Sequence, residues 1–229
     1  MQPPSLPARD NPLAEYFLDN TGRLIHKWHH YFGIYHRHFE RFRGRSPVVL
    51  EIGVSHGGSL QMWRHYFGKG ARIIGVDIDP LCAAFAEEQI EVLIGDQADR
   101  GFLGELRRRF PRVDILIDDG GHTMAQQVAT FEELYLHVHA EGVYLCEDLH
   151  TSYWPKWGGG LRRPGTFIEL SKELIDRLHA WHFAGAAAES DEITRSTHSL
   201  HYYDSIFVVE KRPIAPPVHS RTGHPALPQ

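Results

Sequence analysis

Two acidic clusters directly follow two consecutive apolar runs of this chain. The first reads D-D-G-G-H, from Asp118 to His122, and follows VDILI; the second reads E-D and follows GVYLC. Clustered carboxylates suit a hard divalent cation such as Mg²⁺, Mn²⁺ or Ca²⁺ better than a soft metal. The acids that we expect to bind it are Asp119, Glu147 and Asp148. Taken alone, each cluster is equally compatible with an ordinary turn or a solvated strand end, because Asp and Gly are common turn residues.

The elements around these clusters explain how the acids would converge. Val113–Ile117 is rich in β-branched residues and ends in a turn cluster, which predicts a buried strand. Thr123 can cap a helix whose apolar residues recur at helical spacing, and Val143–Cys146 predicts the next strand. A strand–helix–strand unit of this length gives parallel neighbours with a right-handed crossover. Both strands then end at the same edge of the sheet, about 4.8 Å apart.

Polar groups suited to a nucleoside follow three earlier predicted strands. The glycine turn GVSHGGS comes after Val48–Ile52 and lets the backbone approach a ligand closely, while Asp77 can bind both hydroxyls of a ribose. Asp96 or Gln97, after the third strand, can hydrogen-bond an exocyclic amine such as that of adenine. The turn lacks the GxGxxG spacing of dinucleotide sites, so a cofactor without phosphates fits better. A helix cap at Asp77 and a turn at Asp96 are the alternative roles.

Strand-like and helix-like segments alternate along the chain, which predicts a doubly wound α/β fold. Residues 1–12 and 213–229 are polar and rich in proline, and we expect disordered tails there around one domain at 13–212. Residues 153–165 and 186–204 carry no readable pattern. The remaining predicted elements are a helical lead-in at 13–43, strands at 72–76, 91–94 and 205–210, and helices at 59–66, 80–89, 99–110 and 166–182.

The composition is that of an ordinary globular protein, with 229 residues, 42% hydrophobic and 23% charged. The net charge of -5 gives no electrostatic reason to expect nucleic acid as a partner. Cys82 and Cys146 are expected to be reduced core thiols rather than a disulfide. The chain starts without an apolar leader and has no stretch of 18 apolar residues, so we expect a cytoplasmic protein without a membrane partner. A homo-oligomer is compatible with the sequence.

These residues resemble the class I S-adenosylmethionine-dependent methyltransferases. LEIGVSHGGS is similar to their first motif, VDIDP to their second and GDQAD to their third. DDGGH followed by CED more specifically resembles the metal-dependent macrolide sugar O-methyltransferases of the mycinamicin and macrocin type, as does SLHYYDSIFVVEK near the C-terminus. The resemblance covers about residues 22 to 211. Those enzymes carry a large additional N-terminal domain, where this sequence has a short helical lead-in.

The resemblance implies a Rossmann-like sheet of seven mostly parallel strands, with helices on both faces. It also implies an O-methyltransferase that uses S-adenosylmethionine and Mg²⁺, or Mn²⁺, on a hydroxyl of a small molecule, such as a sugar of an antibiotic or other natural product. His122 would be the general base, and Asp119, Glu147 and Asp148 would hold the metal ion. The residues expected to contact the cofactor are Glu51, Gly53, Ser55, Gly57, Gly58, Ser59, Asp77, Asp96, Gln97 and Asp118.

Two other functions stay open from the sequence. A non-haem iron hydroxylase of the cephalosporin-hydroxylase type would use His122 and the acids as iron ligands, but it needs a second histidine that neither acidic cluster provides. A cofactor-binding protein without catalytic activity would keep the fold alone. The histidine-rich stretch 26–32 suits core packing or a cover over a ligand, and Tyr153–Gly160 suits a closing loop. His198 and His201 would then face the same opening.

Overall fold

A single seven-stranded sheet forms the centre of the protein in the computed structural model, which describes residues 6–184, 190–224 and 226. The strand order is β3-β2-β1-β4-β5-β7-β6, in which β7 is antiparallel to β5 and β6 is antiparallel to β7. The first five strands pair in parallel. The strands are β1 (Val48–Ile52), β2 (Arg72–Asp77), β3 (Ile90–Ile94), β4 (Val113–Asp118), β5 (Val138–Cys146), β6 (Thr197–Tyr203) and β7 (Ile206–Lys211).

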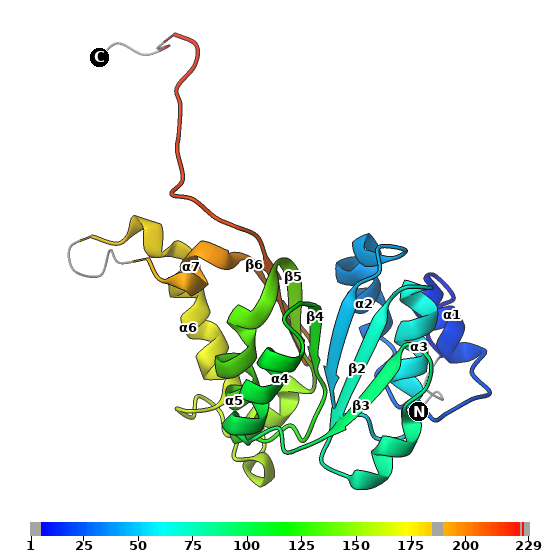
Figure 1. Ribbon diagram of the computed structural model, residues 1–229. Helices are drawn as coiled ribbons and strands as arrows, with labels where there is room; N and C mark the ends of the chain where they lie inside the picture. Colours follow the sequence, from blue (N-terminus) through cyan, green and yellow to red (C-terminus); the bar gives the residue numbers. More distant parts are fainter. Residues whose placement is uncertain (1–5, 185–189, 225, 227–229) are drawn as a thin grey trace.

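Helices cover both faces of this sheet, as Figure 1 shows. The α-helices are α1 (Pro12–Leu18), α2 (Tyr31–Phe39), α3 (Gly58–Phe67), α4 (Arg100–Arg109), α5 (Met124–Leu134), α6 (Phe167–His179) and α7 (Glu192–Ser196). Alternate strand residues face opposite layers, so Val49 packs with α1, α2 and α3 while its neighbour Leu50 packs with α4, α5 and α6. The predicted Rossmann-like fold with a mostly parallel sheet is therefore confirmed.

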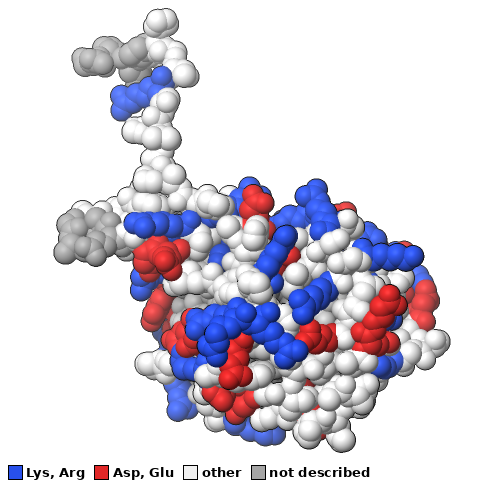
Figure 2. All heavy atoms as spheres, in the orientation of Figure 1, with Lys and Arg blue, Asp and Glu red and all other residues white. Residues whose placement is uncertain are grey.

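Local signals place several helix starts where the sequence predicts them. Thr123 caps α5 through a reciprocal capping box with Gln126, and Thr166 caps α6. Asp99 accepts two backbone N–H groups at the start of α4. Arg100 and Arg107 then form ion pairs with Glu133, which join α4 to α5. Figure 2 shows basic and acidic side chains intermixed over this face of the molecule.

Two predicted elements differ from the structure, and one strand was not predicted. The predicted helix at 80–89 is a 3-10 helix at Pro80–Phe85, because the chain then extends and Gln89 takes a positive φ on entering β3. The predicted helical lead-in at 13–43 is interrupted at residues 19–30, which we call the crossing segment. This segment has no helix or strand and passes the strand ends, where Gly58 lies against its backbone. A strand, β6, occupies residues 197–203, where the sequence showed no pattern.

The C-terminal residues continue past β7 without further regular structure in the described range 212–224, and Figure 1 shows them leaving the body of the protein. Whether the two termini are disordered stays a prediction. Within the described part of the chain, no helix is both long and apolar enough to cross a membrane.

Candidate active site

The acidic clusters meet at the carboxyl edge of the sheet because β4 and β5 pair in parallel, with Asp118 opposite Cys146. Just beyond the strands, Asp119 N donates to Ile52 O at 2.8 Å and Glu147 N donates to Asp118 O at 2.9 Å. These bonds continue the sheet pattern by one residue on each strand. The backbone then turns sharply, and Asp148 has a left-handed conformation with φ of 55°. The parallel crossover thus brings the two clusters together.

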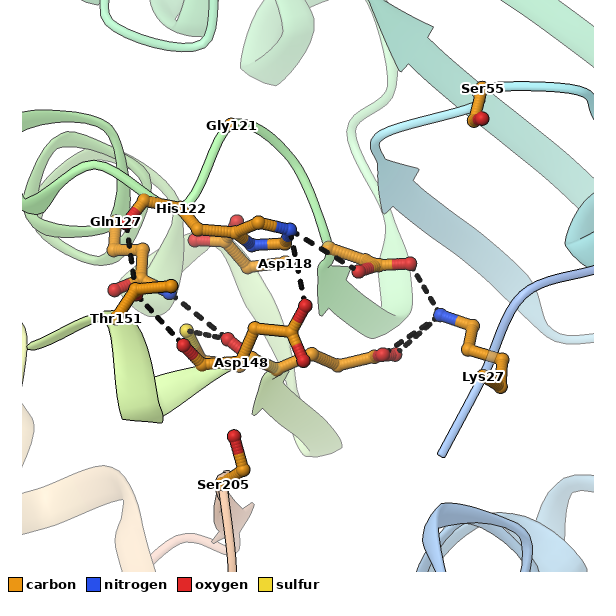
Figure 3. Close-up of polar contacts among 12 residues, drawn as sticks. Lys27, Ser55, Asp118, Gly121, His122, Gln127, Asp148, Thr151 and Ser205 are labelled. Atoms are coloured by element: carbon orange, nitrogen blue, oxygen red, sulfur yellow. Dashed lines mark hydrogen bonds and ion pairs between the residues drawn. The ribbon is translucent and has the colours of Figure 1, made fainter. Parts of the chain in front are cut away.

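Asp119, His122 and Asp148 form a compact group in which the ligand atoms lie within 4.8 Å of one another. His122 Nε2 is 3.3 Å from a carboxylate oxygen of Asp148 and 4.0 Å from one of Asp119. Figure 3 shows the ring of His122 facing Asp148. His122 has a positive φ of 58°, and its ring faces both acids. The two carboxylates of the group, Asp119 and Asp148, are the hard oxygen donors that suit a divalent cation such as Mg²⁺ or Mn²⁺, and His122 lies beside them. The group therefore fits the expected metal.

Glu147, the third expected metal ligand, forms an ion pair with Lys27. Lys27 Nζ lies 2.9 and 2.8 Å from the two carboxylate oxygens of Glu147 and also donates to Asp119. Both side chains are buried, at 4% exposed for Lys27 and 1% for Glu147. Burial lowers the pKa of Lys27, but the charges of Asp119 and Glu147 more than offset it and raise the pKa above the usual value. The lysine therefore stays charged inside the acidic group.

Sequence reasoning missed Lys27, because its partners are 92 and 120 residues away along the chain. The histidine-rich stretch around it had no acid nearby in sequence, but the fold brings Asp119 and Glu147 against it. Tyr31 was missed for the same reason, and its hydroxyl donates to Asp148 Oδ1 at 2.8 Å. The one signal in the sequence that could have pointed to Lys27 was its position as a single lysine among histidines and aromatic residues.

A cavity at the ends of β1, β2, β3 and β4 contains several of the residues expected to bind the cofactor. Its lining includes Gly53, Ser55, Asp77 and Gln97, together with Asp119. Gly53 has φ of 98°, and a Cβ there would lie 1.9 Å from the carbonyl oxygen of Asp119. Only glycine allows this close approach between the loop after β1 and the loop after β4. The approach joins the cofactor-type cavity to the acidic group.

Asp77 organises the glycine turn while lining the cavity. Its Oδ2 accepts the N–H groups of Val54 at 2.8 Å and Ser55 at 3.0 Å. Burial raises its pKa, but backbone N–H groups outweigh this effect and hold the pKa below the usual value. Asp77 is therefore an ionised acceptor at the position expected for a ribose partner.

Gln97, which lines the cavity, forms a buried pair with Asp118. Gln97 Nε2 donates to Asp118 Oδ1 at 2.6 Å and to Thr130 Oγ1 at 2.9 Å. The side-chain oxygen Oε1 of Gln97 accepts from Gly121 N at 3.1 Å. Burial raises the pKa of Asp118 to about 7. Asp118 thus fixes Gln97 and the loop after β4, and it does not line the cavity itself.

The other residues expected at the cofactor have different contacts. Glu51 is fully buried and accepts from Ser59 Oγ at 2.8 Å and Trp63 Nε1 at 3.0 Å, which ties β1 to α3. Ser59 also borders a neighbouring cavity beside Ser55 and His122.

The last three residues expected at the cofactor are Asp96, Gly57 and Gly58. One is a turn residue and the other two are glycines packed against neighbouring elements. Asp96 is exposed, and its carboxylate accepts from Ala98 N in a turn. Gly57 packs on Phe85, and Gly58 packs on the backbone of the crossing segment. The structure thus gives Glu51, Gly57 and Gly58 roles in holding the site together, while the contact of Asp96 is confined to its own turn.

A second cavity also adjoins the acids. It is lined by the histidine-rich stretch His26–Tyr31 together with Asp119, Glu147 and Asp148. Trp28 is 57% exposed there, and its ring meets His150 at 6.1 Å between centroids. His150 in turn meets Trp154 of the loop after β5, at 4.6 Å. Asp119 therefore lines both the cavity at the strand ends and this aromatic cavity, and of these two cavities Asp148 lines only the aromatic one.

Known proteins resemble this chain over about half of their own length. It is 37% identical to demethylmacrocin O-methyltransferase of Streptomyces fradiae over 203 residues. The matched region covers 82% of this chain and 51% of that enzyme. The chain is 36% identical over 210 residues to mycinamicin VI 2''-O-methyltransferase of Micromonospora griseorubida, covering 86% and 51%. No protein-family model matches the chain.

A solved structure gives the same result. A methyltransferase of the mycinamycin biosynthetic pathway, in complex with Mg, SAH and mycinamycin VI, matches with a TM-score of 0.76 at 34% identity, over 88% of this chain and 53% of that one. The resemblance inferred from the acidic clusters and the strand-end motifs is therefore confirmed. This chain is a homologue of the macrolide sugar O-methyltransferases over about half of their length, with their S-adenosylmethionine-dependent methyltransferase fold.

Proposed function

We propose that this chain is an S-adenosylmethionine-dependent, Mg²⁺-dependent O-methyltransferase whose acceptor is a sugar hydroxyl of a glycosylated natural product. The observation that carries the proposal is the convergence of Asp119, His122 and Asp148 beside the two cavities, both of which Asp119 lines. Two of the relatives are named for rhamnosyl tetracenomycin and olivosyl-oleandolide acceptors, which are glycosylated molecules. The relatives and the single histidine of the group make the iron hydroxylase the less favoured function.

The chain's own residues supply the groups that methyl transfer to oxygen needs. A bound Mg²⁺ lowers the pKa of a coordinated hydroxyl and stabilises negative charge on its oxygen. Asp119 and Asp148 would hold the ion, and Glu147 would share its carboxylate with Lys27. His122 Nε2, which faces the same acids, would accept the hydroxyl proton as the oxygen–methyl bond forms and the sulfur–methyl bond breaks.

The cofactor would occupy the cavity at the ends of β1 to β4. Asp77 would bind the ribose hydroxyls, and Gly53 and Ser55 would let the backbone approach the ligand. Gln97 lines the same cavity, so its amide is the group proposed near the adenine. The aromatic cavity of Trp28 and the histidine-rich stretch would receive the acceptor.

Calorimetry with S-adenosylmethionine, with and without Mg²⁺, tests the cofactor assignment. We expect micromolar binding to the wild-type protein and a loss of affinity of at least tenfold in Asp77→Asn. The matched control is Asp96→Asn, since Asp96 is exposed and does not line the cavity. The proposal is rejected if S-adenosylmethionine does not bind in either condition.

Mass spectrometry of a glycosylated macrolide incubated with the enzyme tests the reaction. We expect one methyl group to be transferred in the presence of Mg²⁺ and none after chelation. A cytoplasmic location, the absence of nucleic-acid and membrane partners, and a homo-oligomeric state stay predictions from the sequence.

A further inference from the structure

A second group of metal-ligating side chains lies between α2 and the β6–β7 hairpin, apart from the acidic group. His38 on α2, His201 on β6 and Glu210 on β7 offer ligand atoms that all lie within 4.8 Å of one another. The imidazole centroids of His38 and His201 are 4.7 Å apart. His38 Nδ1 is 2.7 Å from Glu210 Oε1. His201 was expected at the opening of the active site, but the structure places it in this group instead.

The hydrogen bonds around this group orient both imidazoles. The Nε2 atom of His38 is 2.9 Å from the hydroxyl of Tyr203, which leaves Nδ1 toward Glu210. The Nε2 atom of His201 is likewise 2.9 Å from Ser199 Oγ, which leaves its Nδ1 as the other ring nitrogen. Histidine ligands of metal ions commonly use one nitrogen for the metal and hold the other by a hydrogen bond, which fixes the ring and its tautomer. Both rings here have that second bond.

Glu210 is held in a similar way. Its Oε2 accepts from Arg41 Nη1 at 3.0 Å, which leaves Oε1 beside His38. A carboxylate with one oxygen fixed by an arginine can still give its other oxygen to a metal ion. The nearby positive charge limits the affinity of the group for a dication, but it does not block Oε1.

The three side chains of the group are buried or partly buried at the edge of the core. His38 is 1% exposed, while His201 and Glu210 are half-buried. A metal ion could therefore reach the group from solvent past His201 and Glu210. Two imidazoles and one carboxylate are ligands typical of Zn²⁺ and other first-row transition metals, whereas Mg²⁺ prefers oxygen ligands.

We propose that His38, His201 and Glu210 form a second metal site, which takes a Zn²⁺-type dication and joins α2 to the β6–β7 hairpin. Three protein ligands would leave a fourth tetrahedral position for water. The alternative is a hydrogen-bond network that joins these elements without a metal ion. The proposal does not depend on methyltransferase activity.

Calorimetric titration of the metal-free, full-length protein with ZnCl₂ in excess Mg²⁺ distinguishes these two interpretations. We expect His201→Ala to bind one equivalent of Zn²⁺ fewer than the wild type. The matched control is His198→Ala, which removes an exposed histidine of the same strand that is outside the group and should leave the stoichiometry unchanged. Zn²⁺ should also raise the unfolding temperature of the wild type and of His198→Ala more than that of His201→Ala.

Other histidines of the chain can bind Zn²⁺, so the difference between variants carries the test. Equal stoichiometry in the wild type and His201→Ala would overturn the proposal, as would the absence of Zn²⁺ binding. The same loss in His198→Ala would overturn the ligand assignment. Glu210→Gln keeps the shape of the side chain and should weaken Zn²⁺ binding at least tenfold, which a structural effect of truncation at position 201 would not produce.

Discussion

Lys27 brings a positive charge between two acids that would otherwise repel each other. Its side chain is 4% exposed, and its ammonium contacts Glu147 and Asp119. Buried charges need a partner because they have lost the solvation that water provides. A metal ion held by the acids, as proposed, would supply positive charge at the same place. Lys27 and that ion would therefore partly substitute for one another electrostatically.

This substitution predicts the behaviour of Lys27→Met. Without metal, the variant should lose about 3–5 kcal/mol of unfolding free energy, because the acids keep their burial and lose the cation. Urea denaturation with and without Mg²⁺ measures this loss, and Mg²⁺ should restore more stability to the variant than it adds to the wild type. Lys172→Met is the control, because the ion pair of Lys172 with Glu169 is exposed and worth less than about 1 kcal/mol. An equal loss of unfolding free energy in Lys27→Met with and without Mg²⁺ would refute the hypothesis that Lys27 and the metal ion substitute for one another.

His122 carries the proton in the proposed reaction. His122→Ala should lower kcat by about 10²- to 10⁴-fold, which is the usual contribution of a general base. The affinity for S-adenosylmethionine should stay within a factor of two, because His122 does not line the cofactor-type cavity. Steady-state kinetics and calorimetry on the same preparation measure both quantities. Unchanged kcat would remove His122 as the base.

Glu51 predicts a dependence of stability on pH. Burial raises its pKa to about 7, against 4.5 in a solvated chain, despite the nearby charge of Lys27 and the hydrogen bonds from Trp63 and Ser59. The folded protein therefore binds more protons than the unfolded chain between these values. The contribution of Glu51 is fully present below about pH 4.5 and is lost as the pH rises through 7. Urea unfolding of Glu51→Gln should show a smaller fall of stability over this window than the wild type, and identical slopes would contradict the assignment.

At the scale of elements, the loops after β1 and β4 depend on each other through Gly53. Gly53→Ala should disrupt this contact, because its Cβ would lie 1.9 Å from the Asp119 carbonyl oxygen. We expect cofactor affinity to fall at least tenfold and the unfolding temperature to drop, as measured by calorimetry and thermal unfolding. Gly44→Ala is the matched control, because Gly44 also has a positive φ but has no atom within 4 Å of its Cβ position. Equal cofactor affinity in both variants would show that the close approach is not needed.

The sequence predicts the sheet and the acidic clusters because their signals are local. β-branched runs with turn residues after them mark β1, β2 and β4, and Thr123 marks the start of α5. The contacts of Lys27 and the burial of Glu51 depend on residues distant in sequence, so no local pattern could reveal them. β6 was missed because its residues, THSLHYY, are polar and aromatic and lack the apolar run of a buried strand.

At the scale of the whole molecule, the two cavities and the acidic group occupy one edge of the sheet. Elements from both faces contribute, since Lys27 precedes α2 on one face and Thr123 starts α5 on the other. Ligands bound at this edge should therefore stabilise the entire cooperative unit rather than one loop. Parallel strand ends are the usual place for such sites in open α/β sheets.

Thermal unfolding with S-adenosylhomocysteine tests this coupling. At a concentration of 100 times its Kd, the ligand should add about 2.7 kcal/mol to the free energy of unfolding. Far-ultraviolet circular dichroism and tryptophan fluorescence should report the same increase, because both faces unfold together. Methionine alone is the control and should give no increase. Two transitions that respond differently to the ligand would show that the faces unfold separately.

The N-terminal part of the chain completes its contacts last during synthesis. Lys27 pairs with Glu147, 120 residues later, and His38 pairs with Glu210, 172 residues later. Tyr31 likewise reaches the backbone of Ser205. Because contacts between distant residues form late, the contacts of Tyr31 with Ser205 and of His38 with Glu210 can form only after the ribosome has released β7. The rings of Tyr35 and Phe39 can pack earlier, because they contact Trp63, which follows them closely in the chain. Docking of the β6–β7 hairpin onto an already packed α2 is therefore expected to come late in synthesis.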